Sequence, residues 1–467
     1  MVATSSNNTK ESKKENAKYN TVKHSVNDNE GLSLSNKPST LSRLRIFKYL
    51  GPGIITGGSD DDPSGIATCS QAGAQFGFGM LWLALFQFPM MTVIQEMCAR
   101  IGLVTGSGLA SVIKKRYSRK VVFPLASLLL IANTINIGTD IGAMAASIRL
   151  IIPQLPFTIA TLCFTAVILI SEILVPYSKY VKILKYLTIS LFAYVLTAII
   201  IGGNLHQLLI STIVPHVELN PTFAMMFVAI FGTTVSPYLF FWQASEEAEE
   251  DIVKHKIEQI GKGIPKIAKK EIRLMRADTA IGMAFSQLIT WAIIATTAGS
   301  LHTNGVTDIQ TADQAAKALE PLVKTFPHAG EISKTIFALG VIGTGLLAIP
   351  VLAGSSGYAL SDVLGWNEGL NKKFKQARGF YLIIAASTLI GLSINFMNID
   401  PIKALVYTAV INGVVSVPLL FVIMKIANDK TVLKHNTSSI GSNIIGWLTF
   451  VVIGLSVIIM FATWGKQ

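Results

Sequence analysis

Residues 51–68 read GPGIITGGSDDDPSGIAT, and they place three consecutive carboxylates inside an apolar segment. Glycines surround the carboxylates of Asp60, Asp61 and Asp62, and Pro63 lacks the backbone N–H that a continuous helix needs. Charge at membrane depth is costly, and backbone that leaves a helix there must be satisfied by protein or by a water-filled cavity. The stretch therefore predicts a helix broken at Pro63 beside a cavity, with unpaired carbonyls at residues 58–60.

The surrounding chain is typical of a membrane protein. Of its 467 residues, 51% are hydrophobic and only 14% are charged, which argues against a soluble globular domain. Apolar runs of about 20 residues are long enough to cross the hydrocarbon core as helices. The sequence predicts an all-α protein with eleven such spans, at 48–74, 78–99, 121–147, 153–176, 182–203, 222–244, 277–300, 331–358, 379–397, 401–425 and 441–463.

A second interrupted span repeats the first. Gly58 precedes Pro63 by five residues, and Gly232 precedes Pro237 by five within span 6. Interrupted spans at corresponding positions of two halves predict an inverted repeat with a binding site near the bilayer midplane. We expect one five-helix repeat over residues 47–203, a second over 222–425, and an additional helix with the C-terminus over 441–467.

The basic residues predict the orientation in the membrane. The formal charge is +12, but all except six of the 39 Lys and Arg fall on one side of the predicted topology. The positive-inside rule then gives a multi-pass plasma-membrane protein with a cytoplasmic N-terminus and an external C-terminus. The basic residues belong beside anionic lipid, so nucleic acid is not an expected partner. The six on the other side are Arg149, Lys317, Lys324, Lys334, Lys403 and Lys466.

The first 46 residues are rich in Ser, Asn, Lys and Glu and have few apolar side chains. Such a composition predicts a disordered cytoplasmic tail. No apolar stretch follows the initiator, so we expect the first span to serve as its own insertion signal.

The two breaks offer oxygen atoms as ligands. Asp62 supplies a carboxylate, the unwound backbone supplies carbonyls, and hydroxyls come from Ser59, Ser64, Thr233, Thr234 and Ser236. Oxygen donors without a converging Cys or His set suit Mg²⁺, Mn²⁺ or Ca²⁺ better than Zn²⁺ or Cu⁺. Alternatively, Asp60, Asp61 and Asp62 only cap the second half of the broken helix.

The quoted stretch, followed by QAGAQFGFGMLW and ARIGLVTG, resembles the first two helices of the natural resistance-associated macrophage protein (Nramp) metal-ion transporters. The resemblance implies a LeuT-like fold of five plus five helices and an ion bound between helices 1 and 6. The family's D-P-G-N motif falls on residues 62–65 and its M-P-H motif on residues 236–238. The implied metal ligands are Asp62, Gly65 and Ser236, with the carbonyls of Ser59 and Thr233.

The departures from these motifs indicate the substrate. Gly65 stands where the family has Asn, Ser236 where it has Met, and Tyr238 where it has His. A thioether favours transition metals, and its loss removes that preference. The sequence resembles the magnesium-transporting branch of the family, whose wider site would suit a hydrated ion because Mg²⁺ dehydrates reluctantly.

The family's proton relay is incomplete in this sequence. Asp140 remains on helix 3, but Ala143 replaces the Glu of that pattern, and the helix 6 histidines become Tyr238 and Gln243. Without groups that titrate near neutrality, a relay has nowhere to hold a proton. The family's helix 10 Gln aligns with Ala409, although Asn412 lies one turn further on. Further candidates for the site or pathway are therefore Asp61, Ser64, Tyr238, Gln243, Asn412 and Asp140.

We expect a secondary transporter that imports Mg²⁺ and Mn²⁺ by alternating access without proton coupling. The alternatives are a proton-coupled Mn²⁺ or Fe²⁺ symporter, an amino-acid or organic-solute symporter of the same fold, and a receptor that binds without transport. An enzyme is not expected, and the metal is substrate rather than cofactor. The acidic run at 246–251 is expected to be a solvated face. The sequence leaves the oligomeric state open.

Overall fold

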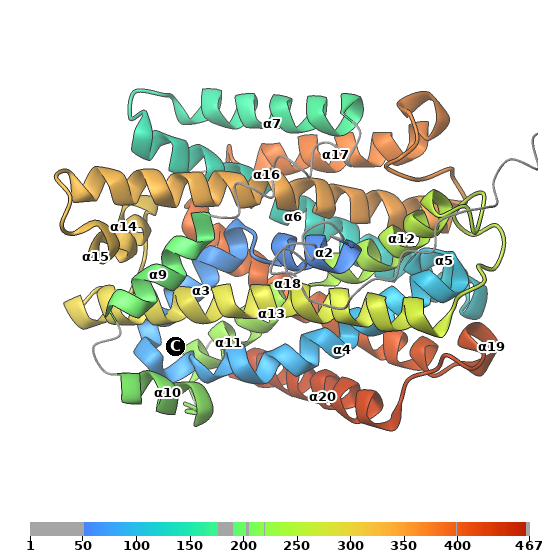
Figure 1. Cartoon of the computed structure of the whole chain (residues 1–467). Helices are drawn as coiled ribbons and strands as arrows, with labels where there is room; N and C mark the ends of the chain where they lie inside the picture. The colour runs from blue at the N-terminus through green and yellow to red at the C-terminus, as the bar shows by residue number, and fades with distance from the viewer. Residues whose placement is uncertain (1–50, 176–189, 202–204, 219, 398, 464–467) are drawn as a thin grey trace, which may run out of the picture. The chain divides into compact units, whose positions relative to one another are not determined.

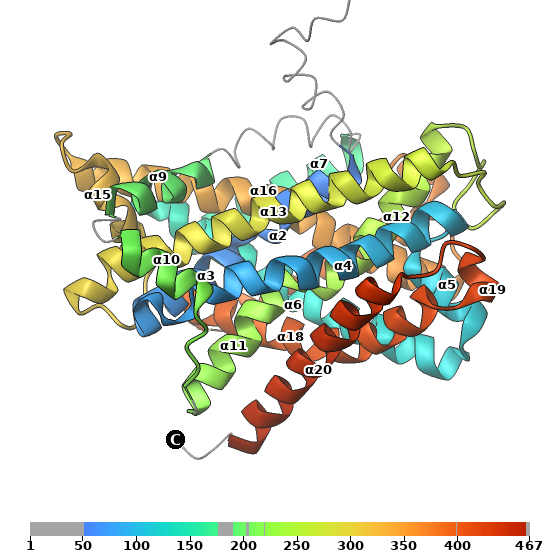
Figure 2. The ribbon, with the colours of Figure 1, turned by 60° about the horizontal axis from the view of Figure 1, so that its bottom comes forward.

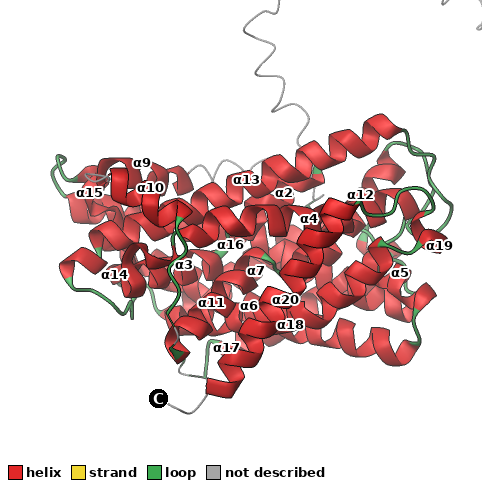
Figure 3. Ribbon diagram, turned by 90° about the horizontal axis from the view of Figure 1, so that it is seen from below, coloured by secondary structure: helices red, strands yellow, loops and turns green. Residues whose placement is uncertain are grey.

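The computed structural model describes residues 51–463, except for 176–189, 202–204, 219 and 398. Across these residues the chain consists of helices and loops without a β-strand (Figure 3). The expected tail at 1–46, the beginning of span 1 and the first part of span 5 lie outside the described residues. The described part of residues 50–467 forms one compact unit.

The first repeat begins with the broken span. Its first half, α2, ends at Asp60, and its second half, α3, begins at Pro63. The next helices along the chain correspond to the predicted spans 2 to 5, with the described part of span 5 ending in α9. Their bounds are α2 Pro52–Asp60, α3 Pro63–Phe76, α4 Trp82–Thr105, α6 Arg119–Ile151, α7 Phe157–Leu174 and α9 Phe192–Ile201.

The second repeat also begins with a broken span, which confirms the prediction drawn from the two spaced prolines. The break separates α11 from α12 at Pro237. The remaining helices correspond to spans 7 to 10, and α20 is the additional eleventh. Their bounds are α11 Pro221–Thr234, α12 Pro237–Val253, α13 Lys269–Ser300, α16 Ala329–Leu364, α17 Arg378–Ile394, α18 Pro401–Ala427 and α20 Ile440–Thr463.

Short helices connect the long ones. On one side lie α10 Leu205–Ile213, α14 Ala312–Ala316 and α15 Glu320–Val323; on the other lie α5 Leu109–Arg116 and α19 Lys430–Leu433. Figure 1 shows these two groups at opposite ends of the long helices.

Seven segments of the described chain are long and apolar enough to span a membrane. They contain α6, α7, the α11–α12 pair, α13, α16, α18 and α20. An eighth would be α3 taken with α4, but these helices are bent from each other by 106° and belong to different predicted spans. Two further apolar helices, α9 and α17, are shorter. The described residues therefore form an all-α bundle of helices long enough to span a membrane, with a broken helix at the start of each half.

The predicted basic loops meet at one end of the bundle. Arg116 after span 2 pairs with Asp429 after span 10 at 2.6 Å. Lys114 donates to the Val363 carbonyl at the end of α16 at 2.8 Å. The backbone N–H of Gly261, after α12, donates to the Gly106 carbonyl. Loops that the charge pattern placed on one side therefore lie on one side.

The broken span lies inside the bundle, with α13 and α16 on either side of α2 (Figure 1). Figure 2 shows α4 and α20 on a neighbouring face. Glycines allow α2 to approach α13 closely, since a Cβ at Gly57 would overlap the Gly282 carbonyl oxygen. Asp278 of α13 also accepts a hydrogen bond from the Gly53 N–H at 2.7 Å. These contacts fix the first half of span 1 against span 7.

Candidate functional site

Pro63 ends one helical segment and begins the next. Because proline lacks an N–H, it fits the first turn of α3, and Asp62 takes the extended conformation of an N-cap. The Asp62 Oδ1 atom accepts from the Gly65 N–H at 2.7 Å. Both sequence interpretations of Asp62 therefore agree with the structure, since it caps α3 and also sits at the break.

Asp62 is buried and faces α6. Only 2% of its surface is exposed. Its Oδ1 accepts a second hydrogen bond from the Ser64 hydroxyl at 2.6 Å, and its Oδ2 accepts one from Asn136 Nδ2 at 2.9 Å. The carboxylate is thus held in place by neutral donors, without an ion pair among the described residues.

Asp60 and Asp61 face a different helix. The Ser286 hydroxyl of α13 donates to Asp60 Oδ2 and lies 3.4 Å from Asp61 Oδ1. Both side chains are buried, and each has one carboxylate oxygen without a hydrogen-bond partner. These two carboxylates therefore turn toward α13, whereas Asp62 turns toward α6. Neither Asp60 nor Asp61 caps α3, unlike the alternative interpretation of the triple Asp run.

The second break carries hydroxyls instead of charges. Ser236 is extended at the N-cap of α12, but its hydroxyl points back and donates to the carbonyls of Gly232 and Thr233, at 2.8 and 2.6 Å. The Thr233 hydroxyl donates to Ile230 O at 3.0 Å, and the Thr234 hydroxyl donates to Gln87 of α4. This break presents neutral hydroxyls that already have partners, in α11 or in α4.

The two breaks meet at Gly65. A Cβ at this position would lie 3.5 Å from Asp62 Oδ1 and 3.9 Å from Thr233 Cβ. A glycine here leaves the space between the carboxylate and the α11 backbone free of side chain. The structure therefore brings the predicted ligands Asp62, Gly65 and Thr233 together.

Tyr238 and Gln243 bind α2. The Tyr238 hydroxyl donates to the Ser59 carbonyl at 2.9 Å. The Gln243 side-chain oxygen accepts from the Thr56 hydroxyl, and its Nε2 donates to Glu247. The expectation of an unpaired carbonyl at Ser59 is therefore wrong, because α12 supplies a phenol that satisfies it.

Asp140 and Asn412 are buried on α6 and α18. Neither carboxylate oxygen of Asp140 makes a well-formed hydrogen bond, although Asp62 and the Ser64 backbone lie nearby. The amide atoms of Asn412 also have no partner. A fully buried amide without partners is costly in a folded protein.

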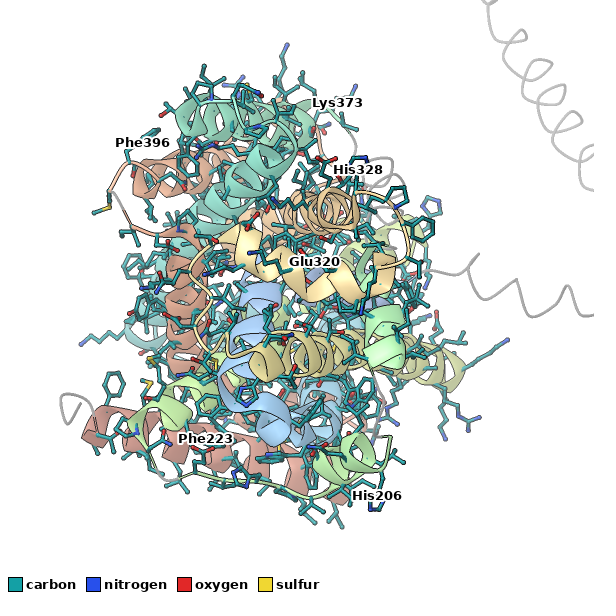
Figure 4. All side chains as sticks on the ribbon, turned by 90° about the vertical axis from the view of Figure 1, so that its left-hand side faces the viewer. His206, Phe223, Glu320, His328, Lys373 and Phe396 are labelled. Atoms are coloured by element: carbon teal, nitrogen blue, oxygen red, sulfur yellow. The ribbon has the colours of Figure 1, made fainter. Side chains whose placement is uncertain are left out.

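The described residues contain no group of three or more His, Cys, Asp or Glu side chains that could hold a metal ion. His206 and His328 lie well apart at the end of the bundle that faces the viewer in Figure 4. A metal at the breaks would thus depend on one carboxylate, backbone carbonyls, hydroxyls and water. Hard cations such as Mg²⁺ and Mn²⁺ accept such a set.

The acidic run after the second break is mostly buried, so the expectation of a solvated face is wrong. Glu247, Glu249 and Asp251 are at most 4% exposed. Glu249 accepts hydrogen bonds from the Tyr358 hydroxyl, the Leu370 N–H and the Asn371 side chain. These contacts fasten the end of α12 to the loop after α16.

Two neighbours of the first break were not identified from the sequence. Asn136 lies four residues before Asp140, so the two share a face of α6, and this spacing was an available signal. Ser286 lies within the apolar α13 and has no comparable signal, because serine is common in membrane helices.

Known proteins share this fold. A manganese transporter of Eremococcus coleocola superposes with a TM-score of 0.69 at 16% identity, covering 91% of this chain and 88% of that one. MhsT, solved with L-phenylalanine, superposes with a TM-score of 0.58 at 11% identity, covering 89% and 98%. At these identities the likeness concerns the fold alone.

Proteins found by sequence comparison have a higher identity to this chain than these structures do. The divalent metal cation transporter MntH of Klebsiella pneumoniae (strain 342) is 28% identical over 319 residues, covering 67% of this chain and 71% of MntH. The inverted repeat and its two broken spans define this chain as an integral membrane protein of the LeuT-like class. The model of the natural resistance-associated macrophage protein-like family matches residues 53–463. The chain belongs to this family, Nramp.

Proposed function

We propose that the chain imports divalent cations, Mg²⁺ and Mn²⁺, across the plasma membrane by alternating access, without coupling to protons. The N-terminus would be cytoplasmic and the C-terminus external, with residues 47–203 and 222–425 as the two repeats. Family membership supports cation transport, as does the similarity to MntH and to the Eremococcus manganese transporter.

One observation carries the choice of substrate. Asp62 is a buried carboxylate at the meeting point of the two breaks, and its hydrogen-bond donors, the Ser64 hydroxyl, the Gly65 N–H and the Asn136 amide, are all neutral. A single negative charge among oxygen donors attracts a hard cation but cannot replace its whole hydration shell. The proposed site is lined by Asp62, the carbonyls of Ser59 and Thr233 and the Ser236 hydroxyl, with water in the space left by Gly65.

The same carboxylate argues against an amino-acid substrate. Solutes with a carboxylate bind to free helix N-termini, where the dipole and the N–H groups attract negative charge. At the N-terminus of α3, Asp62 already occupies the Gly65 N–H. A substrate carboxylate would meet a like charge there.

Uptake into proteoliposomes of the full chain tests the proposal. Internal reporters for metal and for pH would follow Mn²⁺ and Mg²⁺ entry, with Ca²⁺ and Cd²⁺ as competitors. We expect saturable entry of both ions and no matching acidification. Asp62→Asn should abolish entry, whereas Asp313→Asn, which breaks an outer ion pair with Lys334 at 2.7 Å, should retain it.

Acidification in step with Mn²⁺ entry would favour the proton-coupled symporter. Binding without entry would favour a receptor.

A further inference from the structure

Tyr238 connects the two broken spans at the level of the proposed site. It is the second residue of α12, and its ring is 1% exposed. The phenol donates to the Ser59 carbonyl one residue before the end of α2. The hydroxyl therefore occupies a carbonyl of the first break that is suited to bind metal.

We propose that Tyr238 is a positioning residue that sets ion selectivity by keeping the Ser59 carbonyl away from the metal. This inference rests on the proposed function and deepens it. A bound cation would then be held by Asp62 and by water, with the Ser59 carbonyl outside its inner coordination sphere.

The chemistry of the hydrogen bond supports this role. A phenol that donates to a carbonyl directs its positive hydrogen at the oxygen, and a cation on the same oxygen would meet that hydrogen. Inner-sphere ligation by Ser59 therefore requires the phenol to leave. Once it leaves, a buried hydroxyl loses its partner, which carries an energetic cost. The bond thus opposes dehydration of the ion at this position.

Selectivity follows from how readily each ion exchanges water. Mg²⁺ keeps several waters and dehydrates reluctantly, so it loses little when a protein carbonyl is withheld. Mn²⁺ binds nitrogen and oxygen donors of a protein more readily and gains more from an added ligand. A withheld carbonyl therefore favours Mg²⁺ relative to Mn²⁺.

The surroundings hold the phenol in place. A second contact between the same helices joins Gln243 of α12 to Thr56 of α2. The two contacts lie three residues apart on α2 and five apart on α12, so they fix the two helices against each other at two points. The orientation of Tyr238 is therefore set before an ion arrives.

The test uses Tyr238→Phe in the full chain, which removes the hydroxyl and retains the ring. The control is Tyr381→Phe, which removes a phenol that donates to the Lys372 carbonyl at 2.8 Å in the loop after α16. KM and kcat for Mg²⁺ and Mn²⁺ would be measured separately in proteoliposomes.

We expect Tyr238→Phe to lower the KM for Mn²⁺ relative to that for Mg²⁺ by about fivefold, the effect of one added polar contact. The control should leave the ratio unchanged. A common change of both KM values, or no change in their ratio, would overturn the proposal. Asp62→Asn separates the two hypotheses, because retained uptake by that variant contradicts the proposed function itself.

A second measurement does not depend on the variant. Mn²⁺ bound to the wild-type chain can be examined by electron paramagnetic resonance in ¹⁷O-labelled water, which counts its water ligands. We expect water to occupy most of the coordination positions. A Mn²⁺ ion ligated mainly by protein oxygens would contradict the role of Tyr238 even if Tyr238→Phe failed to fold.

Discussion

The breaks in spans 1 and 6 share a backbone design and differ in charge. Each has a glycine five residues before a proline, and each proline begins a new helix. The α2–α3 break contains three carboxylates, two of which keep an unpartnered oxygen. The α11–α12 break contains hydroxyls that donate to carbonyls of α11. The two repeats therefore contain the same backbone break, whereas only the break in the first repeat carries carboxylates.

The largest expected effect removes this charge. Asp62→Asn should reduce metal uptake to background, because no other described carboxylate lies among the ligands at the meeting point of the breaks. Ser236→Ala at the other break should change uptake by about twofold, since a neutral hydroxyl contributes a single modest interaction. Initial rates in proteoliposomes compare the two variants. Equal losses would show that charge does not distinguish the breaks.

Substitutions of two neighbouring glycines in α2 should differ in their effect on stability, because their side-chain positions are packed differently. In Gly57→Ala the added Cβ would overlap the Gly282 carbonyl oxygen, so we expect a loss of about 1–3 kcal/mol in stability from overpacking. Gly58→Ala is the matched control, because its nearest neighbour is the Leu347 side chain at 3.6 Å. Thermal unfolding in detergent measures both.

The same experiment extends to span 6. A Cβ at Gly232 would overlap the Ala409 carbonyl oxygen of α18. Gly232→Ala should therefore destabilise the protein as Gly57→Ala does, since both clashes involve backbone. A tolerated Gly232→Ala would mean that the two half-helices are held by different contacts.

Restoring the family's ligand at each break should shift the metal preference of the site. Gly65→Asn with Ser236→Met adds an amide and a thioether, and we expect a shift of about tenfold toward Mn²⁺ and Cd²⁺ over Mg²⁺ because a thioether favours softer ions. Competition for uptake measures the shift. If Cd²⁺ already excludes Mg²⁺ by orders of magnitude in the unmodified chain, the oxygen-ligand interpretation is wrong.

The smallest effect is expected at Asp140. Asp140→Asn should leave the internal pH unchanged during metal entry, because Ala143, Tyr238 and Gln243 provide no partner for a proton relay near neutrality. An internal pH dye in liposomes provides the measurement. Acidification that follows metal entry in the wild type and disappears in this variant would establish proton coupling instead.

The sequence predicted the features that depend on local chemistry. Pro63 and Pro237 break helices wherever they fall, and the carboxylate of Asp62 marks the functional break by its cost in a membrane. Contacts between helices are harder to predict from the sequence. The contact of Ser286 with Asp60 and the bond from Tyr238 to Ser59 depend on which faces meet across the bundle, and the spacing along one helix does not specify this. The prediction that the acidic run at 246–251 is solvated is wrong for the same reason, because the loop that binds Glu249 lies more than 100 residues further along the chain.

The carboxylate of Asp62, the one charged ligand of the proposed site, also has an electrical consequence for the proposed cycle. With a divalent ion bound, Asp62 and the ion together carry one positive charge; without the ion, the carboxylate carries one negative charge. An inside-negative potential then favours both the inward movement of the loaded site and the outward return of the empty one. Each step gains up to ~2.3 kcal/mol per 100 mV if one charge crosses the whole field. Voltage would therefore drive both halves of the cycle, and the uptake current should keep rising with potential instead of levelling off at a return step that voltage does not affect.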